Sequence, residues 1–107
     1  MSRESLGHFE LLVLLALLRE GDEAYGVPIA DAIAQSTGKR VILASVYNTL
    51  ERLEEKGFVS STVGQPTPER GGRAKRYFSI TTAGLREVRA AKKALTVLWR
   101  GLPVPER

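Results

Sequence analysis

The sequence contains no cysteine and a single histidine, His8. The absence of thiols excludes disulfides, thiolate metal sites and a cysteine nucleophile, and it suits a reducing cytosol. His8 has no cysteine, second histidine or acidic cluster at ligand spacing. We therefore expect a surface or interface histidine, and neither a metal nor a cofactor.

A long hydrophobic segment is also lacking. The longest unbroken apolar run, residues 11–18, is well short of the roughly 20 residues that a membrane span needs. No basic, apolar leader opens the chain. We therefore expect a cytoplasmic protein with no membrane contact, and a length of 107 residues leaves room for one compact domain.

The sequence shows none of the arrangements that are typical of an active site. It has no nucleophile beside a base, no paired carboxylates in an apolar setting and no phosphate loop at the start of a helix. Gly71 and Gly72 lead into a strand, so they indicate a turn and not a nucleotide-binding loop. We predict that the chain is not an enzyme.

The chain has more basic than acidic residues, and its charge is unevenly distributed along the sequence. The formal net charge is +4. Residues 1–38 hold two basic and six acidic residues, whereas residues 81–107 hold six basic and two acidic residues. Such asymmetry favours a polyanionic partner, although many basic surfaces are simply solvated.

Hydrophobic periodicity predicts three helices in the first half of the chain, over residues 6–19, 26–37 and 44–56. Each is followed by a glycine, which accepts the left-handed backbone that often ends a helix. The first helix is apolar on almost every side. It is either a central core helix or a helix that packs against both the core and a partner subunit, with Leu11 and Leu15 at the subunit contact.

The second half predicts a β-hairpin and one more helix. Residues 58–63 and 75–80 alternate in polarity and are rich in β-branched and aromatic residues. Thr81 is a good N-cap for a helix that runs to about residue 100. Along this helix apolar residues recur at steps of three and four, as in the seam of a coiled coil, and we expect them at a dimer interface: Val88, Ala91, Leu95, Leu98 and Leu102.

The predicted fold class is mainly α (α+β), a winged helix-turn-helix with a C-terminal dimerisation helix. We expect residues 1–80 to form the winged helix-turn-helix DNA-binding domain and residues 81–107 to form the dimerisation helix of the same compact unit. On a wheel of 100° per residue, the third helix has a polar stripe opposite its apolar one. The stripe carries the hydroxyl, amide and cationic groups that contact phosphates and base edges, on Ser45, Asn48, Thr49, Arg52 and Lys56.

A polar stripe alone is more often a solvated helix face than a DNA-binding one. The hairpin makes DNA binding the favoured interpretation. Its loop and second strand carry Arg70, Arg73, Lys75 and Arg76 beside two glycines. Such a loop can follow a phosphate backbone or enter a narrow minor groove. The two basic elements together predict binding of double-stranded DNA. The alternative is a winged-helix module for protein interaction or RNA binding.

In order and spacing, several short motifs resemble those of the PadR-like family of transcriptional regulators over nearly the whole chain. The matching residues are Leu6, Gly7, Glu10 and Leu14, then Tyr25, Gly26 and Ile29, then Ser45, Val46, Tyr47, Leu50, Leu53 and Gly57, then residues 71–78, and Thr81 with Gly84. Asn48 stands where the family often has proline, so the base contacts of other members are not carried over to this position.

The resemblance implies a homodimeric regulator, usually a repressor, in which the last helix packs with the first helix of the partner. It also implies DNA contacts from the second helix start, the third helix and the hairpin, at Tyr25, Ser45, Tyr47, Asn48, Arg52, Arg73, Lys75 and Arg76. The single short C-terminal helix is similar to the compact branch of the family.

Trp99 flanks the predicted seam and has two interpretations. Some compact relatives bind flat aromatic compounds between subunits against a tryptophan of this helix, which would make a small aromatic effector a partner at the dimer interface. The matching position in this sequence is Leu95, one turn before Trp99. Packing between subunits is the favoured interpretation, because a large aromatic residue at a dimer seam is ordinary interface composition.

Overall fold

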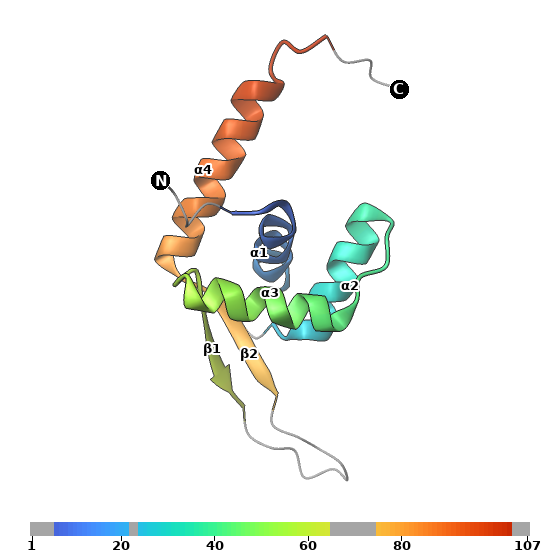
Figure 1. The fold of residues 1–107 in the computed structure, drawn as a ribbon, viewed down its shortest axis with the longest axis vertical. Helices are drawn as coiled ribbons and strands as arrows, with labels where there is room; N and C mark the ends of the chain where they lie inside the picture. Colours follow the sequence, from blue (N-terminus) through green and yellow to red (C-terminus); the bar gives the residue numbers. More distant parts are fainter. Residues whose placement is uncertain (1–5, 22–23, 65–74, 104–107) are drawn as a thin grey trace.

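The computed structural model describes residues 6–21, 24–64 and 75–103. Its elements follow in the order α1 (His8–Glu20), α2 (Gly26–Thr37), α3 (Leu43–Glu55), β1 (Val59–Val63), β2 (Arg76–Ile80) and α4 (Thr82–Trp99). Figure 1 shows α1 in the centre above α3, with the hairpin below α3 and α4 extending away from the other helices. The predicted mainly α fold with one hairpin is confirmed, and the predicted boundaries agree to within two residues.

The core lies between the first three helices and the hairpin. Each helix turns one apolar stripe inward, which the steps of three and four in the sequence require. The largest fully buried apolar side chains are Val13, Leu14, Leu17, Ile29, Val46, Leu50, Leu53 and Phe78. Burial of one such side chain stabilises the fold by about 1.5–3 kcal/mol before the entropy cost of ordering it.

A short connection sets the angle between α2 and α3. Gly38 ends α2 in the left-handed conformation, with φ 75° and ψ 10°, and its amide donates to the Ala34 carbonyl. Residues 39–42 then lead directly into α3. This tight turn between α2 and α3 places α3 across the outer side of the helix bundle (Figure 1).

The hairpin is antiparallel, with Val59 opposite Ile80 and Ser61 opposite Phe78. The chain just before α2 adds to its edge, because Ala24 forms a bridge with Phe78 and the Phe78 amide donates to the Ala24 carbonyl at 2.8 Å. This bridge brings the start of α2 next to β2, although more than 50 residues of sequence separate them. The sequence alone does not predict this pairing.

Among the described residues, the beginning of helix α4 is the part that packs against the rest of the chain. The Thr81 hydroxyl caps it by accepting from the Gly84 amide, as predicted, and Gly84 and Val88 are buried. Ala91 is half-buried, and the large apolar side chains beyond it are exposed, from 48% for Leu102 to 71% for Leu98. No helix in the described parts of the chain combines the length and apolar character that crossing a bilayer requires.

Candidate nucleic-acid interface

Helix α3 presents a polar face to solvent. Ser45, Asn48 and Arg52 are exposed, whereas Val46, Leu50 and Leu53 are fully buried behind them. The placement of Thr49 on this face was wrong, because its side chain is 2% exposed. Thr49 lies three residues after Val46 and four before Leu53, so it borders the buried stripe. The three exposed residues Ser45, Asn48 and Arg52 form the polar face of α3.

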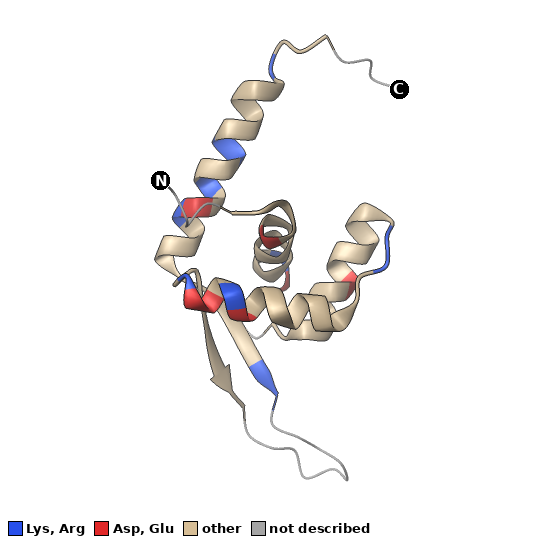
Figure 2. Cartoon of the chain, viewed as in Figure 1, with Lys and Arg blue, Asp and Glu red and all other residues tan. Residues whose placement is uncertain are grey.

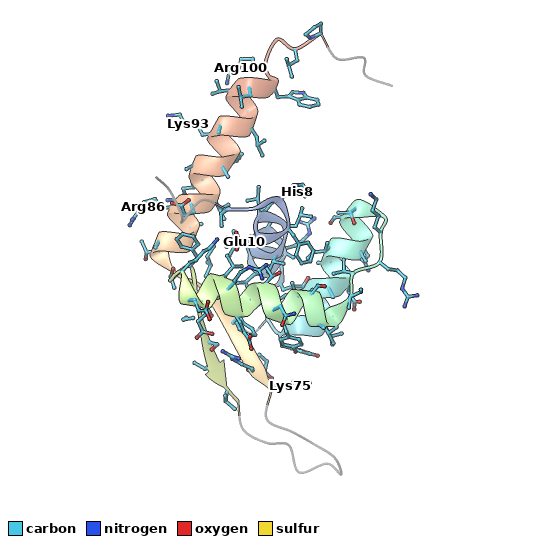
Figure 3. All side chains as sticks on the ribbon, viewed as in Figure 1. His8, Glu10, Lys75, Arg86, Lys93 and Arg100 are labelled. Carbon is cyan, nitrogen blue, oxygen red and sulfur yellow. The ribbon has the colours of Figure 1, made fainter. Side chains whose placement is uncertain are left out.

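An acidic residue of another helix lies behind this face. Glu10 of α1 is 6% exposed, and both of its carboxylate oxygens accept from Lys56 Nζ at 2.9 Å. Its Oε2 is also 3.5 Å from Arg52 Nε. Figure 3 shows Glu10 between α1 and α3. The available signal was a carboxylate directly before the apolar run of residues 11–18, where burial requires a partner for its charge.

The Glu10 carboxyl is charged in the fold. Burial alone would raise its pKa, but the Gly7 amide and the Lys56 ammonium group, together with Arg52, hold that pKa below its ordinary value. The Gly7 amide donates to Glu10 Oε1 at 2.8 Å, so the same carboxylate also caps the start of α1. One side chain therefore ties together the beginning of α1 and the end of α3.

Two tyrosines and a lysine meet where α2 begins beside β2. The ring of Tyr25 packs edge-to-face against Tyr77, with centroids 5.9 Å apart. Lys75 Nζ lies 4.5 Å from the centroid of the Tyr25 ring, which is a cation–π distance. The Ala24–Phe78 bridge makes this meeting possible. Lys75 is exposed and lies just before β2, at the end of the hairpin far from α4, as Figure 3 shows.

Tyr47 is half-buried and packs against the start of α2. Its ring lies directly over Gly26, where an added Cβ would collide with it. It also lies 6.5 Å from the Phe78 ring. Much of this side chain therefore serves to join α3 to α2 and β2.

Arg76 is bound within the structure. Its Nη2 pairs with Glu54 Oε1 at 2.6 Å, and its Nε donates to Ser61 Oγ at 3.1 Å. The guanidinium thereby ties β2 to β1 and to α3, and 40% of the side chain is still exposed. The other arginines assigned to the hairpin, Arg70 and Arg73, and the glycines between them lie outside the described residues.

Positive charge in the described part of the chain extends along α4 as well. Figure 2 shows several cationic positions on this helix, and in Figure 3 Arg86, Lys93 and Arg100 lie on its side away from α1. The apolar seam occupies the opposite side of the wheel. Among the residues described, no three His, Cys, Asp or Glu side chains form a group that could hold a metal ion.

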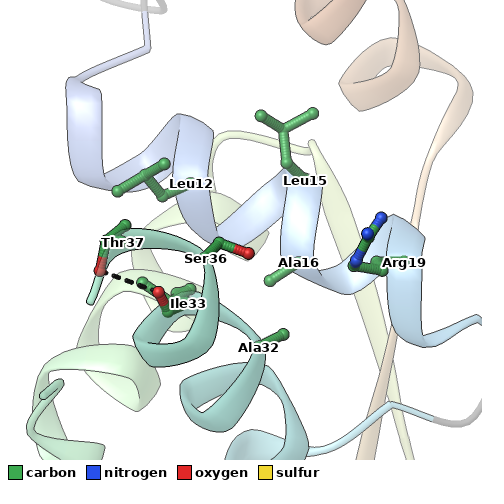
Figure 4. A pocket seen from close by; sticks show the side chains of 8 residues that line it. All are labelled: Leu12, Leu15, Ala16, Arg19, Ala32, Ile33, Ser36 and Thr37. Carbon is green, nitrogen blue, oxygen red and sulfur yellow. Dashed lines mark hydrogen bonds between the residues drawn. The ribbon is translucent and has the colours of Figure 1, made fainter. Parts of the chain in front are cut away.

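A groove of about 380 Å³ runs between α1 and α2. Figure 4 shows Leu15 and Arg19 at its α1 side and Ser36 and Thr37 at its α2 side. Leu15 is 45% exposed, and Leu18, three residues further along α1, is 39% exposed. The part of α1 that faces away from the core is therefore apolar, like the exposed end of α4.

Three packed helices with α3 outermost, followed by an antiparallel hairpin, define a winged helix, which is a DNA-binding fold. The family model for PadR-like transcriptional regulators matches residues 14–90. The chain belongs to this family, so it is a transcriptional regulator with a winged-helix DNA-binding fold, and the hairpin is its wing. The resemblance noted from the sequence is thereby confirmed.

Solved structures agree with this assignment. A PadR family regulator from Eggerthella lenta DSM 2243 is 27% identical, with a TM-score of 0.68, and the match covers 84% of this chain and 76% of that one. A PadR family regulator from Clostridium difficile R20291 is 21% identical, with a TM-score of 0.71, and the match covers 88% and 93% of the two chains. No curated protein shows significant sequence similarity to the chain.

Proposed function

We propose that the chain is a homodimeric repressor that binds an inverted-repeat operator, with α3 in the major groove and the wing along the phosphate backbone. The observation that carries this proposal is the polar face of α3, which is exposed beside an exposed lysine of the wing. A two-fold symmetric dimer presents two such helices to two half-sites, so the operator should share that symmetry.

The side chains of α3 suit base recognition. The amide of Asn48 can bond to adenine through two atoms, and the guanidinium of Arg52 can bond to guanine in the same way. Ser45 lies one turn before Asn48, at the N-terminal end of the helix, which is the part that enters the groove in helix-turn-helix proteins. Tyr47 can contribute its hydroxyl, since its ring is only half-buried.

Contacts to the phosphate backbone fall to the wing and to the start of α2. The Lys75 ammonium group, which lies over the Tyr25 ring, can bind a phosphate at this point, and Tyr25 can donate its own hydroxyl nearby. Arg76 can add the part of its guanidinium that Glu54 does not occupy. Arg73, outside the described residues, is assigned to the same role.

Two exposed apolar surfaces support the dimer. One is the outer side of α1 with the α1–α2 groove. The other is the seam of α4, which runs from the buried Val88 and the half-buried Ala91 to the exposed Leu95, Leu98 and Leu102. Exposed apolar surface of this extent marks an interaction site. We assign Leu11 and Leu15 of one subunit to the contact with α4 of its partner. Trp99, 64% exposed, would then pack between subunits, where a small aromatic effector could compete with it.

The test begins with the DNA upstream of the chain's own gene. A footprint should reveal a protected inverted repeat, and titrations should then compare this operator with a scrambled duplex at one salt concentration. Asn48→Ala or Arg52→Ala should weaken operator binding by about 1–3 kcal/mol and scrambled binding much less, because base contacts carry the difference.

Gln35→Ala is the matched control, since this exposed polar residue lies on α2 away from α3. Equal losses on both duplexes would reduce Asn48 and Arg52 to phosphate anchors. Binding that prefers RNA, or that does not weaken as salt is raised, would favour the alternative winged-helix functions.

A further inference from the structure

The buried carboxylate of Glu10 lies close to the proposed DNA-binding face without being part of it. With 6% of its surface exposed, Glu10 cannot reach a ligand outside the protein. Its two cationic partners, Arg52 and Lys56, both belong to the end of α3. An acidic group so close to a DNA-binding helix weakens its attraction for phosphates, so its presence calls for a compensating role.

Arg52 is restrained on two sides although its side chain is 54% exposed. Its Nε faces Glu10 Oε2 at 3.5 Å, and its Nη2 donates to Thr49 Oγ1 at 3.3 Å. A planar guanidinium with two of its nitrogens directed at internal acceptors has a fixed plane. A fixed plane is what bidentate recognition of a base edge needs, because the cost of ordering the side chain has already been met.

Lys56 is held differently. Its ammonium group bonds to both oxygens of Glu10 at 2.9 Å, and 20% of its side chain is exposed. A lysine held in this way is not available for contacts with the phosphates of the DNA backbone. The same carboxylate therefore orients one cation of α3 and withholds the other.

We propose that Glu10 is a specificity-determining positioning residue for DNA binding: it fixes the Arg52 guanidinium for base recognition and keeps Lys56 from the phosphate backbone. The inference rests on the proposed function, because it takes α3 as the helix that reads DNA. It assigns to α1 a role in sequence discrimination that the contacts of α3 alone would not show.

Loss of the Glu10 charge should affect binding to the scrambled duplex and preference for the operator in opposite directions. Glu10→Gln keeps the size of the side chain and an oxygen for the Gly7 amide, but it removes the charge that holds the cations. Release of Lys56 should strengthen scrambled-duplex binding by about two- to fivefold, the range of one exposed ionic contact. Loss of the Arg52 orientation should lower the ratio of operator to scrambled affinity by about tenfold.

The experiment measures both affinities for the full chain, wild type and E10Q, at one salt concentration, with melting followed by circular dichroism to show that each variant is folded. Glu20→Gln is the matched control, since it makes the same change in charge at the exposed end of the same helix. The double variant E10Q/R52A completes the test. With Arg52 removed, E10Q should no longer change the ratio.

A lower ratio together with stronger scrambled binding supports the proposal. A purely structural role would weaken both duplexes alike, and that result overturns it, as does a ratio that E10Q leaves unchanged. A drop of equal size in E20Q would attribute the effect to net charge and would also overturn it. If the wild type binds both duplexes equally, the proposed function itself fails and this inference fails with it.

Discussion

At the scale of single residues, the helical wheel of α3 placed the centre of each face correctly and failed at the borders. Val46, Leu50 and Leu53 are buried and Asn48 is exposed, as their angles require. Thr49 is buried although its hydroxyl suggested exposure, because its side chain lies beside the apolar stripe and finds its partner in Arg52. A wheel describes one helix, so it cannot indicate which neighbour covers an edge.

The role of Glu10 was beyond sequence analysis for a similar reason. Its partners lie 42 and 46 residues further along the chain, at Arg52 and Lys56. Only the packing of α1 against α3 brings these groups together. The sequence places this carboxylate directly before an apolar run, but it does not indicate which cations meet it.

A pH-dependent stability difference follows from the charge of Glu10. Glu10→Gln should lower the free energy of unfolding at pH 7 by about 1–3 kcal/mol, because a buried carboxylate loses its charged hydrogen bonds. The pKa of Glu10 is lower in the fold than its ordinary value of 4.5. The stabilisation is therefore fully present above pH 4.5 and is lost as the pH falls through the folded pKa.

Urea denaturation at a fixed protein concentration, at pH 7 and at steps below pH 4.5, measures this difference between wild type and E10Q. The gap between the two proteins should narrow on acidification. The exposed Glu20→Gln variant should show no such gap. A gap that widens at low pH would contradict the assignment of Glu10 as a buried, charged residue.

At the scale of secondary structure, the sequence predicted every element of the described chain, because each has a clear period and a recognisable end. Helix α2 has the predicted bounds, from the residue after Tyr25 to the residue before Gly38. The contacts between these elements could not be predicted from the sequence. The Ala24–Phe78 bridge and the contact of Tyr47 with Gly26 join segments distant in sequence, and these contacts position the tyrosines of the candidate interface.

The junction of α4 with the hairpin gives a test of one such contact. A Cβ on Gly84 would collide with the Phe58 carbonyl oxygen and would approach Ile80 Cγ1 to 2.8 Å. Alanine ordinarily stabilises an exposed helix by about 1 kcal/mol relative to glycine. Gly84→Ala should instead destabilise the protein by about 1–3 kcal/mol, because backbone cannot move aside easily.

The control reverses the substitution at an exposed position of the same helix. Ala90→Gly should cost about 1 kcal/mol through helix propensity alone. Thermal unfolding of the two variants and the wild type compares them directly. If Gly84→Ala raised the melting temperature, close packing between α4 and the start of β1 would be ruled out.

At the scale of the whole molecule, the single chain leaves two apolar surfaces uncovered. The sequence predicted a seam along α4, and the structure shows that its outer half meets nothing in its own described chain, with Leu95 58% and Trp99 64% exposed. The exposed side of α1 is the second surface. Which surface meets which is a property of the assembly, so neither periodicity nor one chain can determine it.

The last prediction tests the assembly with two neighbouring residues of α4. Leu95 lies on the seam and Val97, two residues later, lies about 200° around the helix, on the opposite side. Both are similarly exposed in the single chain, at 58% and 52%, so a charge at either position should cost the subunit fold little. Leu95→Glu should therefore produce a folded monomer, whereas Val97→Glu should keep the wild-type dimer mass. Light scattering at micromolar concentration gives the masses, and circular dichroism checks the helices. A dimeric L95E protein, or equal dissociation of both variants, would remove the seam of α4 from the subunit interface.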